Sequence, residues 1–144
     1  VVSGCESPAG LVGSCDSLHA ARLDISSLTV QSLYGQLTTD SSLIVRIVGS
    51  LNLTDCEISR SSVTALTYAS ACALECTSAA VDNVTYRDCN ISTFPTLTTP
   101  GSATVIAVRG LNEFTESGLT AENVSLNADI TGVVTADPQS DYYN

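Results

Sequence analysis

The chain has 144 residues, a formal net charge of −10 and six cysteines, with 44% hydrophobic and 14% charged residues. This composition excludes a disordered chain, which needs low hydrophobicity and high charge, and the length suits a single domain over residues 1–144. The basic residues are five scattered arginines, which excludes a surface for nucleic acid or an anionic membrane, and no apolar run is long enough to span a membrane.

Residues 1–17 carry two cysteines, Cys5 and Cys15, among turn-forming glycine and proline residues. Strand and helix signals are weak there, so we predict a disulfide-stapled N-terminal cap or docking arm. In the chain-entropy treatment, a bridge between Cys5 and Cys15 stabilises the fold by about 3 kcal/mol.

Residues 18–132 repeat one pattern: an apolar-x-apolar pair, two turn-like residues, and a second such pair. The copies are Leu23–Val30, Leu51–Ile58, Val84–Ile91 and a looser one at Val124–Ile130. Because strand side chains alternate with period 2, each copy predicts two short strands joined by a bend. Fixed strands with variable loops are typical of stacked coils that bury apolar edges against one another.

A further apolar stretch precedes three of the copies and predicts a third strand in each coil. These stretches are Leu43–Val48, Ala71–Cys76 and Thr104–Arg109. Alternation that points Leu43 inward places Ile44 and Val48 outside, and the same phase places Val105 outside. We therefore expect an outward apolar strip that needs a cover, either a loop or another molecule. The polar tail, residues 133–144, is expected to fray or to dock through Tyr142 and Tyr143.

The strand–bend–strand copies place Asp55 and Asp88 at bends, where aspartate tolerates left-handed backbone. With the segments Val81–Ser92 and Gly118–Gly132, they resemble the right-handed parallel β-helix of the pectate-lyase-like superfamily. The resemblance implies an all-β fold: a short right-handed parallel β-helix of about four coils. An antiparallel β-sandwich that lends a donor strand to a neighbour is the alternative.

The superfamily includes polysaccharide lyases, glycoside hydrolases and adhesins, and in such enzymes acidic residues and histidine are the candidates for catalysis. Asp55 and Asp88 are expected at equivalent bend positions, where aspartate is also an ordinary bend former. The sole histidine, His19, lacks metal-ligand spacing and a nucleophile motif. We predict no catalytic residue, no metal site and no cofactor.

Four N-glycosylation sequons occur, and the strand phase places each on the outside. They begin at Asn52, Asn83, Asn90 and Asn123. Together with the even number of cysteines, they favour a secreted, extracellular protein that carries N-glycans.

Two of the remaining cysteines are expected to pair. Cys56 and Cys89 are predicted to share an inward column and to form a disulfide, because stacked strands lie within bridging distance. Cys72 and Cys76 are too far apart to pair on one extended strand. Either that stretch turns or each pairs elsewhere.

These features favour a structural extracellular glycoprotein that self-assembles into a fibril, coat or matrix. Copies would associate head to tail through the ends of the stack, with the outward apolar strip as a lateral contact. The alternative is a polysaccharide-active enzyme, or a carbohydrate-binding or adhesin module.

Overall fold

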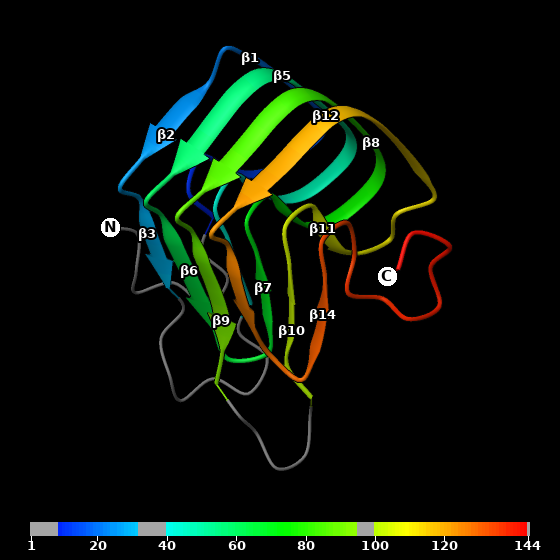
Figure 1. The fold of residues 1–144 in the computed structure, drawn as a ribbon. Helices are drawn as coiled ribbons and strands as arrows, with labels where there is room; N and C mark the ends of the chain where they lie inside the picture. The colour runs from blue at the N-terminus through cyan, green and yellow to red at the C-terminus, as the bar shows by residue number, and fades with distance from the viewer. Residues whose placement is uncertain (1–8, 32–39, 95–99, 144) are drawn as a thin grey trace.

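The computed structural model describes residues 9–31, 40–94 and 100–143. These residues form strands joined by bends, and every described strand pair is parallel (Figure 1). This excludes the antiparallel sandwich. Nowhere in the described ranges is there a helix of the length and apolarity needed to cross a bilayer.

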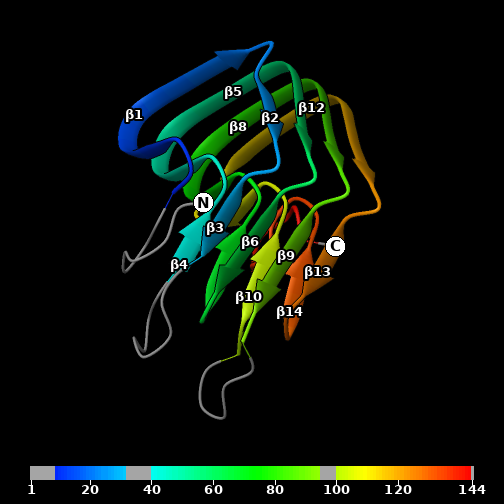
Figure 2. The ribbon, with the colours of Figure 1, turned by 90° about the vertical axis from the view of Figure 1, so that its left-hand side faces the viewer.

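Three parallel sheets form the sides of the stack (Figure 2). The first sheet holds β1 (Val12–Ala21), β2 (Asp24–Ser26), β5 (Val45–Ser59), β8 (Ala73–Arg87), β11 (Ala107–Arg109) and β12 (Glu113–Glu122). The second holds β3 (Thr29–Gln31), β6 (Ser62–Ala65), β9 (Asn90–Thr93) and β13 (Ser125–Asn127). The third holds β4 (Asp40–Ser42), β7 (Tyr68–Ser70), β10 (Ser102–Thr104) and β14 (Ile130–Gly132).

The chain visits the three sheets in turn and makes four coils. The first coil runs from β1 to β4, the second from β5 to β7, the third from β8 to β10, and the fourth from β11 to β14. The prediction of a short, all-β parallel β-helix of about four coils is thus confirmed. The strands run from residue 12 to residue 132, so β1 lies partly within the segment predicted as an N-terminal arm.

Two columns of left-handed residues bend every coil at the same places. The first column contains Arg22, Asp55, Asn83 and Gly118, with φ of 57°, 53°, 53° and 84°. The second contains Ser27, Arg60, Asp88 and Asn123, with φ of 62°, 49°, 55° and 52°. Aspartate, asparagine and glycine predominate because this backbone region costs other side chains about 1–2 kcal/mol.

The register corrects the alignment of the predicted copies. Leu23 and Val84 share one column as expected, but its second-coil member is Cys56, five positions after Leu51. Leu51 belongs to the column of Leu18 and Ala79. Each coil bends twice, at positions five residues apart, with an apolar pair on either side. Moving one coil by five residues relative to the next therefore again aligns apolar residues with apolar residues. The fourth predicted copy begins at Val124, but the register partner of Val84 is Leu119, five residues earlier.

Each of the three stretches predicted as third strands contains a two-residue corner between the third and first sheets and then enters a strand of the first sheet, β5, β8 or β11. The corner residues are Leu43, Ile44, Ala71, Cys72, Val105 and Ile106, all fully buried. The predicted outward apolar strip of Ile44, Val48 and Val105 is therefore wrong, since all three lie in the core. Both residues of a corner face inward because the chain changes direction there. Val48 lies three residues after the buried Val45 and is buried as well. Two consecutive partly buried residues, Arg46 and Ile47, separate them, so the alternation of inward and outward side chains shifts by one residue there.

The core is a set of apolar columns that is most completely sealed in the two central coils. Leu53 and Val63 of the second coil, and Val84 and Ile91 of the third, have no exposed side-chain surface. Burying each such side chain contributes about 1.5–3 kcal/mol. Tyr86 is the largest of these residues, and its hydroxyl donates to the Ala71 carbonyl at 3.4 Å.

Candidate functional site

Side-chain ladders follow the bend columns on the outside of the stack. The Asn83 Nδ2 donates to Asp55 Oδ1 at 2.7 Å, and the Asn123 Nδ2 donates to Asp88 Oδ1 at 2.6 Å. Each bond joins one coil to the next across a column of left-handed residues. Because the acceptor is a carboxylate, these are stronger than bonds between neutral groups.

The bend columns also separate the two aspartates that were considered for catalysis. Asp55 lies in the first bend column beside Asn83, whereas Asp88 lies in the second beside Asn123. The expectation that they occupy equivalent positions is therefore wrong. Each carboxylate accepts an amide hydrogen, which is the structural role of a bend former.

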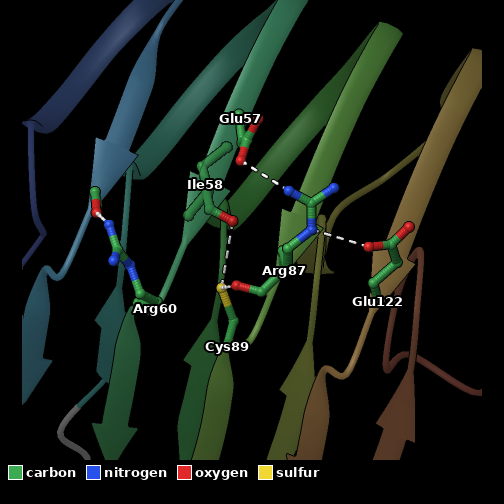
Figure 3. Close-up of polar contacts among 7 residues, drawn as sticks. Glu57, Ile58, Arg60, Arg87, Cys89 and Glu122 are labelled. Atoms are coloured by element: carbon green, nitrogen blue, oxygen red, sulfur yellow. Dashed lines mark hydrogen bonds and ion pairs between the residues drawn. The ribbon is translucent and has the colours of Figure 1, made fainter.

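An ion-pair ladder crosses three coils beside the second bend (Figure 3). Arg87 Nη1 lies 3.2 Å from Glu57 Oε1 of the second coil, and its Nε lies 2.9 Å from Glu122 Oε2 of the fourth. All three side chains are roughly half exposed, so solvent screens the attraction and its contribution to stability is small. Arg60 Nη2 donates to Ser26 Oγ of the first coil at 2.6 Å.

No disulfide joins any two of the described cysteines, which are Cys15, Cys56, Cys72, Cys76 and Cys89. The predicted shared column of Cys56 and Cys89 is wrong, because Cys56 pairs with Val84 in the register while Cys89 follows the next bend. Cys89 donates to the carbonyls of Ile58 and Arg87 (Figure 3). Cys5 lies outside the described residues, so its bridge to Cys15 stays a prediction.

The stretch with Cys72 and Cys76 does turn, at residues 71–72, and both thiols are buried. Burial raises the pKa of Cys76 from 9.0 to about 11, against hydrogen bonds with the backbone of Ser78 and Leu51 that lower it. Burial also raises the pKa of Cys72 and of Cys89. These thiols are protonated at neutral pH and are poor nucleophiles and metal ligands.

The sequon asparagines all lie toward the outside of the stack. Asn83, Asn90 and Asn123 are exposed, and Asn52 is partly buried on the outer face of β5. Asn83 and Asn123 were expected in one column but lie in different bend columns. Their Nδ2 atoms, which would carry a glycan, already donate to aspartates. An amide that carries a sugar keeps one hydrogen for such a bond.

Two adjoining shallow depressions lie on the outer face of β5, β8 and β12. Their volumes are about 280 and 160 Å³, and Asn52, Ala80 and Thr115 line both. These three residues are register neighbours, so the depression follows from the small side chain of Ala80 between two larger ones. Asp82 and Glu116 add carboxylates to the larger depression.

His19 lies exposed on β1 and pairs in the register with Asn52. No group of three or more His, Cys, Asp or Glu side chains within the described ranges is placed to hold a metal ion.

The two ends of the stack differ from its middle. β1 and β3 are edge strands at one end, where Ala9 bridges β4 at Ser42, and β12, β13 and β14 are edge strands at the other. We call these the first-coil end and the fourth-coil end. At both ends several inward apolar side chains are only partly buried, among them Leu18 and Leu23 at the first and Leu119 and Val124 at the second, although Val30 of the first coil is fully buried.

Residues 133–143 partly cover the fourth-coil end. Val105, Ile106 and Ala107 donate backbone hydrogen bonds to the carbonyls of Val133 and Val134. The Tyr142 ring meets Phe114 edge to face, with centroids 5.9 Å apart. The tail thus docks on its own chain.

Glu116 is a residue of this end that sequence reasoning missed. It pairs with Val81, whose column continues to Leu53 and Ala20, so its backbone position continues an inward column in the last coil. The Glu116 side chain itself is exposed at this end and also borders the larger depression. The spacing Phe114-x-Glu116 is the signal that could have identified it.

No protein-family model, curated protein or solved structure matches the chain. The stack of parallel strands is compatible with the pectate-lyase-like resemblance at the level of fold, while membership of that superfamily stays a prediction.

Proposed function

We propose that this chain is a structural extracellular glycoprotein that associates with copies of itself through an end of its stack. It would serve as the subunit of a fibril, coat or matrix, without catalytic activity. One contrast carries the proposal: the central coils are sealed, whereas the end coils leave strand edges and inward apolar side chains partly exposed. Repeat proteins either cap such ends or associate through them.

Outward sequons support the extracellular part of the proposal. Asn52, Asn83, Asn90 and Asn123 lie on the sides of the stack, where glycans would leave the ends free for contact. The lateral contact expected from the sequence is dropped from the proposal, because the strip that would form it is in the core.

Sedimentation velocity of the full chain over a wide range of concentrations tests the association. We expect a sedimentation coefficient that rises with concentration and approaches that of an oligomer. A coefficient of a monomer at every concentration would contradict the proposal. Secretion from a eukaryotic host, followed by enzymatic removal of N-glycans, should lower the mass of the protein. An unchanged mass would show that the secreted protein carries no N-glycans, which would contradict that part of the proposal.

A carbohydrate-binding module is the second candidate, favoured by the polar depressions around Ala80. Their hydroxyl, amide and carboxylate groups could bind a sugar, but a glycan on Asn52 would occupy the same place. Binding of polysaccharides by the Asn52→Gln variant, compared with the glycosylated protein, separates the two. Saturable binding of a soluble polysaccharide would favour this second candidate.

A further inference from the structure

The fourth-coil end carries a charge that opposes the addition of another strand. Glu116 lies in the column of Val81, Leu53 and Ala20, where a further coil would place an apolar side chain. Inward charges at sheet edges are a known means of preventing strand addition. Glu116 Oε2 also accepts the backbone N–H of Leu119 at 3.0 Å, so an added strand would have to displace it.

Net charge also disfavours contact between two fourth-coil ends. The acidic residues of this coil and the tail are Glu113, Glu116, Glu122, Asp129, Asp137 and Asp141, and the basic residue is Arg109. Two such surfaces face to face would repel each other. Arg109 is already engaged by Glu75 at 3.4 Å.

The first-coil end has no such charge at an inward position of β1. The side chains of β1 that turn toward the core are Val12, Cys15, Leu18 and Ala20. Its edge is therefore compatible with a further strand that continues the same apolar layer.

The edge formed by β1 and its continuation across the left-handed bend at Arg22 has the same sequence of exposed and partly buried positions in both directions. From residue 14 to residue 24, exposed and partly buried positions are arranged symmetrically about His19. In an antiparallel pair of two copies centred on His19, Leu18 would oppose Ala20 of the second copy, inward against inward. Cys15 would likewise oppose Leu23. Register between strands is set by this matching of faces.

The charges of the same edge are complementary in that register. Asp16 and Arg22 lie three positions on either side of His19, so each would oppose the other in the second copy. Both side chains are exposed, and the two-fold axis would generate the ion pair twice. An isologous interface requires such self-complementarity.

We propose that a second copy of this chain binds the β1 edge antiparallel, centred on His19, while Glu116 closes the fourth-coil end. This proposal rests on the proposed function, because it assigns the self-association to one edge. Self-association through this edge alone stops at a closed dimer, so growth into a fibril, coat or matrix would need a further contact.

Charge exchange in the full chain tests the register. Arg22→Asp would place a carboxylate opposite Asp16 of the second copy, twice about the two-fold axis, and we expect it to raise the dimer Kd about tenfold or more. The fold should accept this change, because Asp55 holds the same left-handed column position. Asp16→Arg combined with Arg22→Asp should restore the wild-type Kd. Arg60→Asp is the matched control, one coil inward at a left-handed bend, and should leave the Kd unchanged.

Two further variants test the ends. Ala20→Glu puts into the first coil the residue that Glu116 provides in the fourth, and should abolish the dimer. Glu116→Ala should allow species larger than a dimer. Circular dichroism melting confirms that each variant is folded.

The outcomes separate the two proposals. A wild-type monomer at every concentration overturns both. A wild-type oligomer whose Kd is unchanged by Arg22→Asp and Ala20→Glu overturns the β1 interface and leaves self-association intact. Loss of the dimer in both variants, with recovery in the charge exchange, supports the interface.

Discussion

The burial gradient along the stack predicts that one substitution has different effects in adjacent coils. Leu51 and Leu18 are register partners in one column, but Leu51 is 1% exposed in the second coil whereas Leu18 is partly exposed in the first. We compare Leu51→Ala with Leu18→Ala. The chemical change is identical, so the difference reports the surroundings alone.

The magnitude follows from what each side chain contacts. Truncating a fully buried leucine removes roughly 2.5 kcal/mol of transfer free energy, at about 0.8 kcal/mol per methylene. The cavity that Leu51→Ala leaves between Leu18 and Ala79 brings the loss to about 3–5 kcal/mol. Leu18→Ala removes a side chain that water already reaches, and its site opens to solvent, so we expect a loss of about 1 kcal/mol.

Urea unfolding followed by circular dichroism measures both losses. The protein is kept at a concentration where the monomer predominates, because Leu18 would be buried in the proposed dimer. A domain of this size has about 5–15 kcal/mol of stability, so both variants should still fold. Equal losses for Leu51→Ala and Leu18→Ala would refute the reasoning that the central coils are sealed and the first is open.

Three further predictions concern a bend and the buried thiols. Asn83→Ala should lower stability by about 1–2 kcal/mol, because it removes the bond to Asp55 and strains a left-handed position; Asn83→Gly should cost less, and equal losses would contradict this. The free energy of unfolding should be constant below about pH 9 and should fall between pH 9 and pH 11. The reason is that burial raises the pKa of Cys76 in the folded state from 9.0 to about 11, so the thiol ionises first in the unfolded chain. A free energy of unfolding that stays constant over that range would contradict this prediction. Cys72, Cys76 and Cys89 should resist iodoacetamide at neutral pH until urea unfolds the chain; a requirement for reductant before labelling would show that they are not free thiols.

Local chemistry made the bends predictable. Asp55 and Asp88 interrupt the alternation of apolar residues, and aspartate is among the few side chains that accept left-handed backbone. Arg22 and Arg60 adopt the same conformation without any such signal. Their bends follow from the coils stacked on them, where Asp55 and Asp88 occupy the neighbouring positions of the first and second columns.

Contacts between coils were harder to predict than the coils themselves. The error that paired Leu23 with Leu51 also placed Cys56 beside Cys89 and Asp55 beside Asp88. One wrong register thus produced an incorrect disulfide and an incorrect carboxylate pair. Sequence spacing could not correct it, because both registers match apolar residues to apolar residues.

The amino-acid sequence by itself determined short strands in about four repeats, bends at Asp55 and Asp88, and sequons on the outside, because period-2 alternation and left-handed bends act within a few residues. Only the tertiary structure decided that the strands pair in parallel, which residues share a column, that the third apolar stretches contain buried corners, and that Glu116 continues an inward column at one end. Those features depend on how each coil lies on the next, and a pattern that repeats every five residues is equally satisfied by several such alignments.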